Sequence, residues 1–369
     1  MESKHKSAAE LFGFDRPFAI TMWEFSWIER RWAGAGYEDW DVALTELKER
    51  GYDAVRIDAF PHLVAADVKK DWLLKPEWCF QCWGSYSINK INLYDNLKGF
   101  LTACRKHNIK VGLSTWFRED VDNVRMNINS PKEHAQIWIK TIDLIKESGL
   151  LDTVIYVDLC NEFPNDWAPF YSRKYGKSRF TDDAYRWMRE AVTEFKKAYP
   201  TIPVTFSLTT PYPNPHEDLS FLDFLEPHLW MANSCDYYEK VNYNYDRFSH
   251  KSYDNLMLYG KEIYLREKER YIQCLKDEIK RVVEWSIAND KPLITTECWA
   301  IVDYKDGPML DWDWVLELNE IGVKEAASTG RWAGIATSNF CGPQFVGMWR
   351  EKDWHKRLTD LIHASKLPE

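Results

Sequence analysis

The chain has 369 residues, of which 45% are hydrophobic, and a formal net charge of −9 at pH 7. This length fits one large α/β barrel with insertions better than several ordinary domains, so we expect a single domain over residues 1–369. The acidic balance and the lack of a basic run argue against a nucleic-acid partner. No stretch approaches the roughly 18 apolar residues of a membrane span, so no membrane association is expected.

Strand-like and helix-like patterns alternate along the chain, which is typical of βα units around a parallel sheet. The expected strands are at residues 18–23, 54–58, 110–115, 154–158, 203–208, 227–231, 292–297 and 333–338. The expected helices are at residues 37–50, 93–107, 131–147, 182–198, 262–288, 312–328 and 352–363. The fold class predicted is therefore α/β, a (β/α)8 TIM barrel with loop insertions at the C-terminal face of the strands.

Two segments do not fit the βα pattern and are expected to be those insertions. Residues 61–87 carry three tryptophans with little periodicity, and residues 235–260 are rich in Tyr, Asn and Asp. Long connections without a regular pattern are usually functional loops. If both lie over the barrel mouth, they could close a cleft into a pocket, which would favour removal of terminal sugars.

The N-terminus and the cysteines indicate the cellular compartment in which the protein is expected. The N-terminal segment 1–6 contains Glu2, Lys4 and Lys6 and is followed by no apolar segment, so we see no signal peptide, although a removed leader would look the same. Eight cysteines are present, and a chain of this size needs no disulfides. A cytoplasmic protein is therefore expected.

Two glutamates follow buried strands at corresponding places. Glu162 stands in an Asn161-Glu162-Phe163-Pro164 turn after strand 154–158, and Glu297 ends strand 292–297. Cleavage of a glycosidic bond needs one carboxylic acid to donate a proton and one carboxylate to attack or stabilise the developing cation. Strand ends hold such groups rigidly and point them into the loop crevice. A single glutamate at a strand end could equally be part of a salt bridge, but two of them favour catalysis.

The residues around these glutamates resemble a known group. Residues 155–164 look like the acid/base strand of clan A glycoside hydrolases, the cellulase-like (β/α)8 barrels, and residues 293–297 look like their nucleophile strand. Val55-Arg56-Ile57 and Pro227-His228-Leu229-Trp230 resemble the strand-two and strand-six motifs of the family-five cellulases.

The resemblance implies a retaining hydrolase that cleaves an O-glycosidic bond by double displacement. Glu162 would be the acid/base and Glu297 the nucleophile, which Arg56 would keep ionised and oriented. Asn161 could hydrogen-bond the sugar 2-hydroxyl. Two alternatives stay open, because Arg56 could instead brace Asp58, and His228 could be a core histidine bonded to backbone. This mechanism requires no metal and no organic cofactor.

Other candidate sugar ligands come from strand ends. Trp116 and Trp299 are expected to stack on sugar rings, and Asn339 is a further candidate. Glu24, after the first strand, could bind sugar hydroxyls or be structural. Asp158 alternates with the inward positions of its strand and is interpreted as an internal hydrogen-bond acceptor.

The chain departs from the family-five pattern at three places. Trp230 stands where those enzymes have tyrosine, and Thr115 or Trp116 stands where they have a strand-three histidine. Strand eight lacks the usual tryptophan, for which Phe340 or Trp349 could substitute. A divergent cellulase-like family acting on small oligosaccharides or glycosides is therefore expected.

These departures keep a second hypothesis open, a catalytically silent carbohydrate-binding barrel of the same fold. A metal-dependent barrel hydrolase would need clusters of histidine and carboxylate at several strand ends, and only His228 is available. The sequence predicts a carbohydrate partner and leaves the sugar, the linkage and the oligomeric state open.

Overall fold

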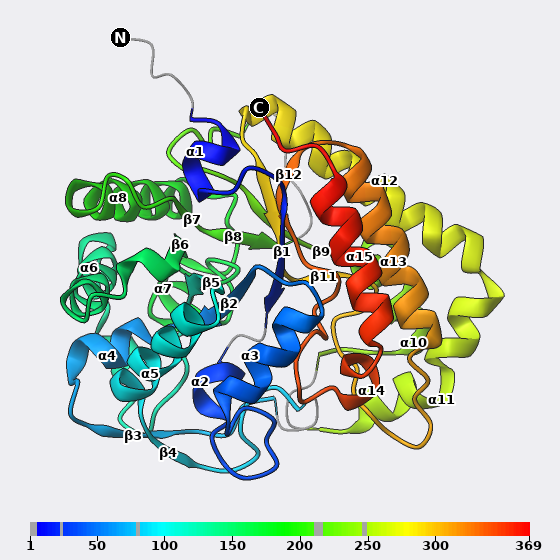
Figure 1. The fold of residues 1–369 in the computed structure, drawn as a ribbon, viewed down its shortest axis with the longest axis horizontal. Coiled ribbons are helices and arrows are strands. Elements are labelled where there is room, and N and C mark those ends of the chain that lie inside the picture. Colours follow the sequence, from blue (N-terminus) through cyan, green and yellow to red (C-terminus); the bar gives the residue numbers. More distant parts are fainter. Residues whose placement is uncertain (1–5, 23–24, 79–81, 210–216, 246–248) are drawn as a thin grey trace.

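The computed structural model describes residues 6–22, 25–78, 82–209, 217–245 and 249–369. Within them, parallel strands follow one another around a ring in chain order, with helices outside (Figure 1). The strands of the ring are β1 (Phe18–Met22), β2 (Ala54–Asp58), β5 (Lys110–Ser114), β6 (Val154–Asp158), β7 (Val204–Thr205), β8 (Ser207–Thr209), β9 (Glu226–Trp230), β10 (Leu293–Thr295), β11 (Cys298–Trp299) and β12 (Trp332–Ile335).

The ring consists of two hydrogen-bonded sheets, which meet where the fifth and the seventh strands are each divided into two short strands. One sheet has the order β10-β12-β1-β2-β5-β6-β7 and a second has the order β11-β9-β8. β7 and β8 are two halves of the fifth strand position, and β10 and β11 are two halves of the seventh. A parallel bridge between Leu225 and Leu293 adds a link between the sixth and seventh positions. The predicted (β/α)8 barrel is confirmed.

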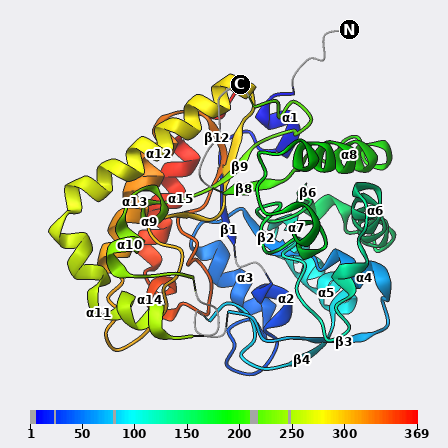
Figure 2. The same ribbon diagram turned by 180° about the vertical axis from the view of Figure 1, so that it is seen from behind.

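The helices form the outer layer, which Figure 2 shows from behind. They are α1 (Ala8–Phe12), α2 (Ser26–Glu29), α3 (Trp40–Glu49), α4 (Pro61–Ala66), α5 (Leu93–Lys106), α6 (Pro131–Glu147), α7 (Pro169–Tyr175), α8 (Asp182–Ala198), α9 (Met231–Ser234), α10 (Tyr237–Val241), α11 (Lys251–Arg266), α12 (Lys268–Asn289), α13 (Asp313–Ser328), α14 (Val346–Trp349) and α15 (Lys352–Ala364). Two short 3-10 helices cover Val124–Asn127 and Leu151–Thr153. Among the helices that the structure describes, none has the length and apolar character to cross a membrane.

The barrel interior is filled by side chains at matched levels. Register pairs Arg56 of β2 with Gly112 of β5, and Thr209 of β8 with His228 of β9. A Cβ on Gly112 would lie 2.3 Å from the ring of Tyr156, so only glycine leaves room for this buried ring. These pairings bring polar residues of separate strands to the same end of the barrel.

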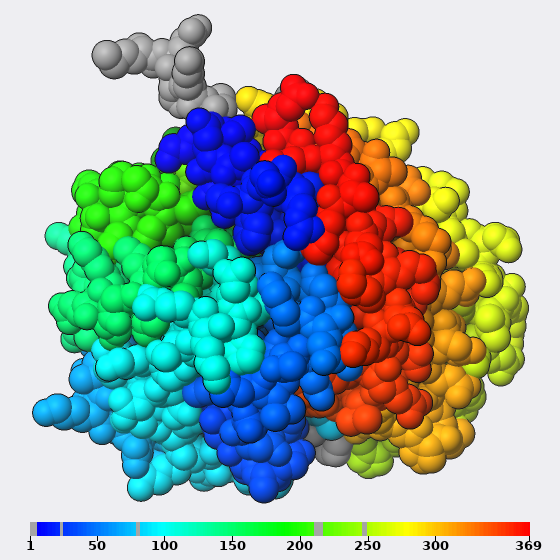
Figure 3. Space-filling view, in the orientation of Figure 1, coloured from blue at the N-terminus to red at the C-terminus, as the bar shows by residue number. Residues whose placement is uncertain are grey.

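The two ends of the chain close the barrel against each other. Figure 3 shows the C-terminal part of the chain, in red, beside the N-terminal part, in blue. The Arg50 guanidinium donates to the carbonyl of Trp349 over 2.8 Å, and the Thr359 hydroxyl donates to the carbonyl of Arg50 over 2.8 Å. These buried bonds tie the segment after α3 to α14 and α15.

The insertions differ from the loops that we expected. Residues 61–87 contain α4 and β3 (Asp71–Leu74), which pairs antiparallel with β4 (Asn89–Asn92). In β3 alternate residues are buried, a pattern hidden in the sequence because Leu73, on the outer face, is also apolar.

The segment 235–260 is largely helical and leads into α11. The helix expected at 262–288 is divided, because Glu267 has non-helical dihedrals between α11 and α12. Buried aromatic residues, Tyr264 and Tyr271, stand on both sides of this break. The apolar pattern of the sequence is therefore continuous and does not reveal the break. In Figure 1 the β3–β4 hairpin, α10 and α11 lie on the side opposite α1.

Candidate active site

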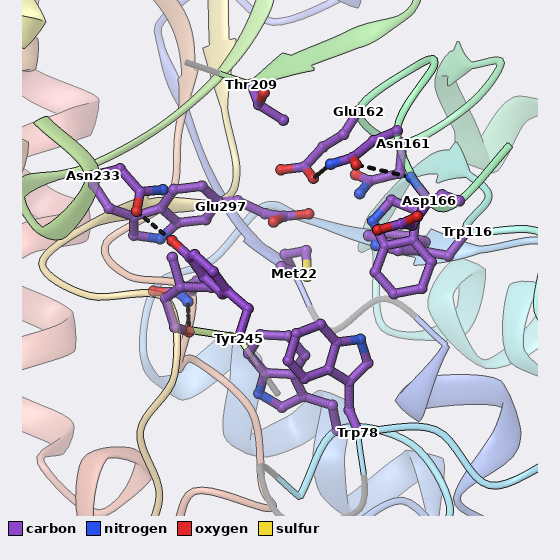
Figure 4. Close-up of a pocket in the computed structure, with 16 residues that line it drawn as sticks. Met22, Trp78, Trp116, Asn161, Glu162, Asp166, Thr209, Asn233, Tyr245 and Glu297 are labelled. Carbon is purple, nitrogen blue, oxygen red and sulfur yellow. Dashed lines mark hydrogen bonds between the residues drawn. The ribbon is translucent and has the colours of Figure 1, made fainter. Parts of the chain in front are cut away.

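A cavity of about 300 Å³ opens at the carboxyl ends of the strands (Figure 4). Most of its lining comes from aromatic rings and from amide and carboxyl side chains. The lining residues are Met22, Trp78, Trp83, Trp116, Asn161, Glu162, Asn165, Asp166, Trp167, Thr209, Trp230, Asn233, Tyr245, Glu297, Val302 and Asn339. Cavities that hold small ligands are of this size or larger.

The two glutamates predicted from the sequence face each other across this cavity. One oxygen of Glu162 and one oxygen of Glu297 lie within 4.8 Å of each other. The imidazole of His228 lies between them, with Nδ1 3.0 Å from Oε1 of Glu162 and 3.5 Å from Oε2 of Glu297. His228 is therefore no core histidine bonded only to backbone.

Arg56 lies fully buried next to the cavity and meets four acidic or amide groups. Its Nη1 atom is 3.3 Å from Oε1 of Glu297. Its Nη2 atom is 2.7 Å from both Oδ2 of Asp158 and Oδ1 of Asn161, and its Nε atom is 3.1 Å from Oε1 of Glu226. The guanidinium thus fixes the orientation of Glu297 and Asn161 together.

The alternative partner of Arg56, Asp58, is held by other groups. Its carboxylate accepts from the backbone N–H of Phe60 at 2.6 Å and of Trp116 at 2.9 Å. Asp158 accepts from the Ser114 hydroxyl at 2.6 Å, which confirms its interpretation as an internal acceptor.

Burial dominates the charge balance of the site. Burial raises the pKa of Glu297 to about 7, the charge of Glu162 adds to the shift, and His228 and Arg56 oppose it. Burial alone would lower the pKa of His228, but the carboxylates of Glu297 and Glu162 outweigh it and raise this pKa. Burial also raises the pKa of Glu226.

Local backbone structure aims Glu162 at the cavity. β6 ends at Asp158, and Glu162 has a φ of 48°, in the left-handed region that residues other than glycine rarely adopt. Its N–H donates to the Ser207 hydroxyl over 3.0 Å, and the Asn165 amide donates to its Oε2 over 3.2 Å. Strained conformations of this kind persist where neighbours over-determine them, often at functional positions.

Three other predicted ligands also reach the cavity. One face of Trp116 is covered by Arg56, whose Cζ atom is 4.6 Å from the ring centre, so only the opposite face is available for a sugar. The Trp230 indole N–H and the Asn339 Oδ1 atom have no hydrogen-bond partner among the described residues. Glu24 lies outside the described residues.

The stacking role expected for Trp299 is wrong. Its side chain is fully buried, its indole N–H donates to the carbonyl of Ala336, and Gly322 of α13 packs directly on it. Phe340 and Trp349 do not line the cavity either, so neither replaces the tryptophan missing from strand eight.

Several residues that line the cavity were not named as candidate site residues from the sequence. Trp78, Trp83 and Tyr245 come from the two aromatic insertions, whose composition was the only signal available. Asn165, Asp166 and Trp167 follow Glu162 in the chain, and Asn233 follows Trp230, without a distinguishing pattern. Glu226 was missed because a glutamate at the start of a buried strand gives no sign of its partner, Arg56.

The same three central side chains have the spacing of a metal site. Glu162, His228 and Glu297 each offer one ligand atom, and these atoms lie within 4.8 Å of one another. Carboxylate and imidazole ligands would suit a divalent transition metal, and hydrolysis by two carboxylates does not require one.

Two solved structures share this fold at low sequence identity. The β-glycosidase BGL167 has a TM-score of 0.52 and 12% identity, with 96% of this chain and 97% of that chain covered. GH5_18 from Streptomyces cattleya, in complex with GlcNAc, has a TM-score of 0.52 and 10% identity, with 96% and 83% covered. These similarities show the fold, a TIM barrel, and the paired carboxylates lie at the carboxyl ends of its strands.

A more similar structure is a glycoside hydrolase candidate from Parabacteroides distasonis ATCC 8503. It shares 46% identity, a TM-score of 0.93, and coverage of 96% of this chain and 95% of its own. The family model described as sugar-binding cellulase-like matches residues 20–363, and the chain belongs to that family. A search of curated proteins finds no match.

Proposed function

We propose that this protein is a retaining glycoside hydrolase that cleaves the O-glycosidic bond of a small oligosaccharide or glycoside. The observation that carries this proposal is the separation of Glu162 and Glu297, whose nearest ligand oxygens lie within 4.8 Å. Retaining enzymes hold their carboxyl groups about 5–5.5 Å apart, whereas inverting enzymes need about 6.5–9.5 Å to admit a water.

Each central residue has a role in the double displacement. Glu162 protonates the leaving oxygen while Glu297 attacks the anomeric carbon, forming a covalent glycosyl-enzyme. Glu162 then takes a proton from water, which attacks the same carbon and releases Glu297 as a carboxylate. Arg56 stabilises that carboxylate, and His228 hydrogen-bonds Glu162 and approaches Glu297.

Asn161 is the proposed ligand of the sugar 2-hydroxyl. Its Oδ1 atom accepts from Arg56 over 2.7 Å, so its amide N–H groups are the ones that can donate to a sugar in the cavity. This interaction strengthens as the ring flattens toward the transition state.

A catalytically silent sugar-binding barrel is the second candidate. It is favoured by the departures from the family-five pattern near the two glutamates, with Trp230 where those enzymes have tyrosine and no tryptophan on strand eight. A binding protein would keep the cavity and its aromatic lining but show no turnover.

The test is hydrolysis of a panel of aryl glycosides at pH 8 by wild type, Glu162→Gln and Glu297→Gln. Glu284→Gln, on the exposed side of α12, is the matched control. We expect wild type and control to hydrolyse at least one glycoside, with retention of anomeric configuration by NMR and no loss in a chelator. Background rates for all four proteins would contradict the enzyme and favour the binding barrel.

A further inference from the structure

Three of the cavity tryptophans form one continuous surface. Trp78 and Trp83 have ring centres 4.7 Å apart at an interplanar angle of 43°, and Trp78 and Trp167 are 6.4 Å apart at 37°. All three line the cavity and are at most 7% exposed. We call Trp78, Trp83 and Trp167 the tryptophan wall.

The tryptophan wall is connected to Glu162 rather than to Glu297. Trp167 follows Glu162 in a turn in which the Asn165 N–H donates to the Glu162 carbonyl over 2.8 Å and the Ala168 N–H donates to the Asn165 carbonyl over 3.1 Å. The Asn165 amide also contacts Oε2 of Glu162 at 3.2 Å. Trp167, one end of the wall, therefore belongs to the turn that carries Glu162.

Amide and hydroxyl groups line another part of the cavity. In Figure 4 Asn233 and Tyr245 lie on one side of Glu297, while Asp166 and Trp116 lie on the other side. The Tyr245 hydroxyl donates to Asn233, and both belong to the chain after β9. Amide and hydroxyl groups of this kind suit the hydroxyls of the sugar that is cleaved.

A buried ion pair holds the wall in place. Arg118 is 1% exposed, contacts Glu29 of α2 through two hydrogen bonds of 2.9 and 2.8 Å, and donates to the Lys75 carbonyl over 2.9 Å. The Arg30 guanidinium donates to the carbonyl of Gly84 over 2.9 Å. Lys75 and Gly84, which flank Trp78 and Trp83, are thus each hydrogen-bonded to an arginine, and preorganisation of this kind lowers the entropy cost of binding.

We propose that the tryptophan wall is the leaving-group subsite and selects glycosides whose leaving group presents a flat apolar face. A general acid must lie next to the oxygen it protonates, so the leaving group has to extend from Glu162 toward the wall. An aryl ring or the C–H face of a pyranose would stack there. The direction of this assignment rests on the proposed role of Glu162.

Three substrates that share one sugar separate this role from a general structural one. They are the 4-nitrophenyl glycoside, a disaccharide and the glycosyl fluoride of the hexose that the glycoside panel selects. Trp78→Leu and Trp167→Leu keep apolar bulk but lose the flat face. We expect kcat/KM to fall about tenfold to hundredfold for the two ring-bearing leaving groups and to stay within about twofold for the fluoride, which has no ring.

Asn233→Ala is the contrasting variant, because it removes a ligand of the sugar itself and should lower kcat/KM for all three substrates alike. Equal losses for fluoride and aryl glycoside in the two tryptophan variants would overturn the proposed subsite. A larger loss for the fluoride would also overturn it.

Ligand binding tests the proposed leaving-group subsite without requiring turnover. Titration calorimetry compares 4-nitrophenyl and methyl glycosides of glucose, galactose, mannose and xylose on wild type and Trp78→Leu. We expect wild type to bind at least one aryl glycoside about tenfold more tightly than its methyl partner, and Trp78→Leu to lose this preference. Absence of any aryl preference in wild type would overturn the inference, even if hydrolysis is found.

Discussion

The guanidinium of Arg56 contacts the carboxylate of Glu297 over 3.3 Å, although the two residues are 241 positions apart in the chain. The same buried cation also meets Asp158 and Glu226. One buried positive charge therefore lies against three acidic groups. The pH dependence and the stability of the site follow from this arrangement.

Removal of the buried cation should be severely destabilising. Arg56→Met leaves Asp158 and Glu226 buried without a compensating charge, and we expect a loss of about 3–5 kcal/mol in the free energy of unfolding by urea denaturation. The matched control is Arg16→Met, whose partner Asp53 forms a more exposed ion pair and for which about 0–1 kcal/mol is expected. Equal stability of the two variants would contradict this account.

The activity should rise with pH through neutrality. Glu297 must be ionised to attack, and burial raises its pKa to about 7, so kcat/KM should increase between about pH 6 and 8. His228→Asn removes a charge that lowers this pKa, so the ascending limb should move to higher pH. A limb centred below pH 5, unmoved by the substitution, would show that Glu297 is not the group that titrates.

The same carboxyl should limit stability at alkaline pH. Its folded pKa of about 7 is above the ordinary value of 4.5, so its contribution is fully present below about pH 4.5 and is lost as pH rises through 7. Wild type should therefore lose up to about 3 kcal/mol more than Glu297→Gln between pH 5 and pH 8.5. Urea unfolding at both pH values measures this, with Glu284→Gln as control. Parallel losses in all three proteins would refute it.

A second buried carboxyl should act in the same direction away from the paired glutamates. Asp303 is fully buried, neither of its oxygens has a hydrogen-bond partner among the described residues, and burial raises its pKa well above the usual range. Its folded state keeps a proton that the unfolded chain releases above about pH 4. Asp303→Leu should therefore raise Tm at pH 8 and change it little at pH 4. No gain at pH 8 would contradict this expectation.

Much of the fold could be predicted because each strand carries its own pattern. β2, β6 and α8 lie where the sequence placed them, since apolar runs and helix-end signals are local. The break between α11 and α12 and the β3–β4 hairpin were missed. Tyr264 and Tyr271 are buried on both sides of the helix break, so their apolar character hides it. Leu73 is exposed although it is apolar, so the alternation of β3 cannot be seen in the sequence.

The error at Trp299 has a specific cause. Strict alternation along the seventh strand would place Trp299 on the same side as Glu297. β10 ends at Thr295 and β11 begins at Cys298, so alternation is interrupted at Glu297. The glutamate then faces the cavity, and the indole packs against Gly322 of α13.

The sequence alone determined which strands carry Arg56 and His228 and which strands Glu162 and Glu297 follow, because βα periodicity and short motifs are local properties. Tertiary structure decided what these residues do to one another. Only ring closure brings His228 to 3.0 Å from Glu162 and buries Arg56 among three carboxylates. Only the packing of the 61–87 insertion against the loop after β6 brings Trp78 and Trp83 to Trp167, since contacts between distant loops do not follow from sequence spacing.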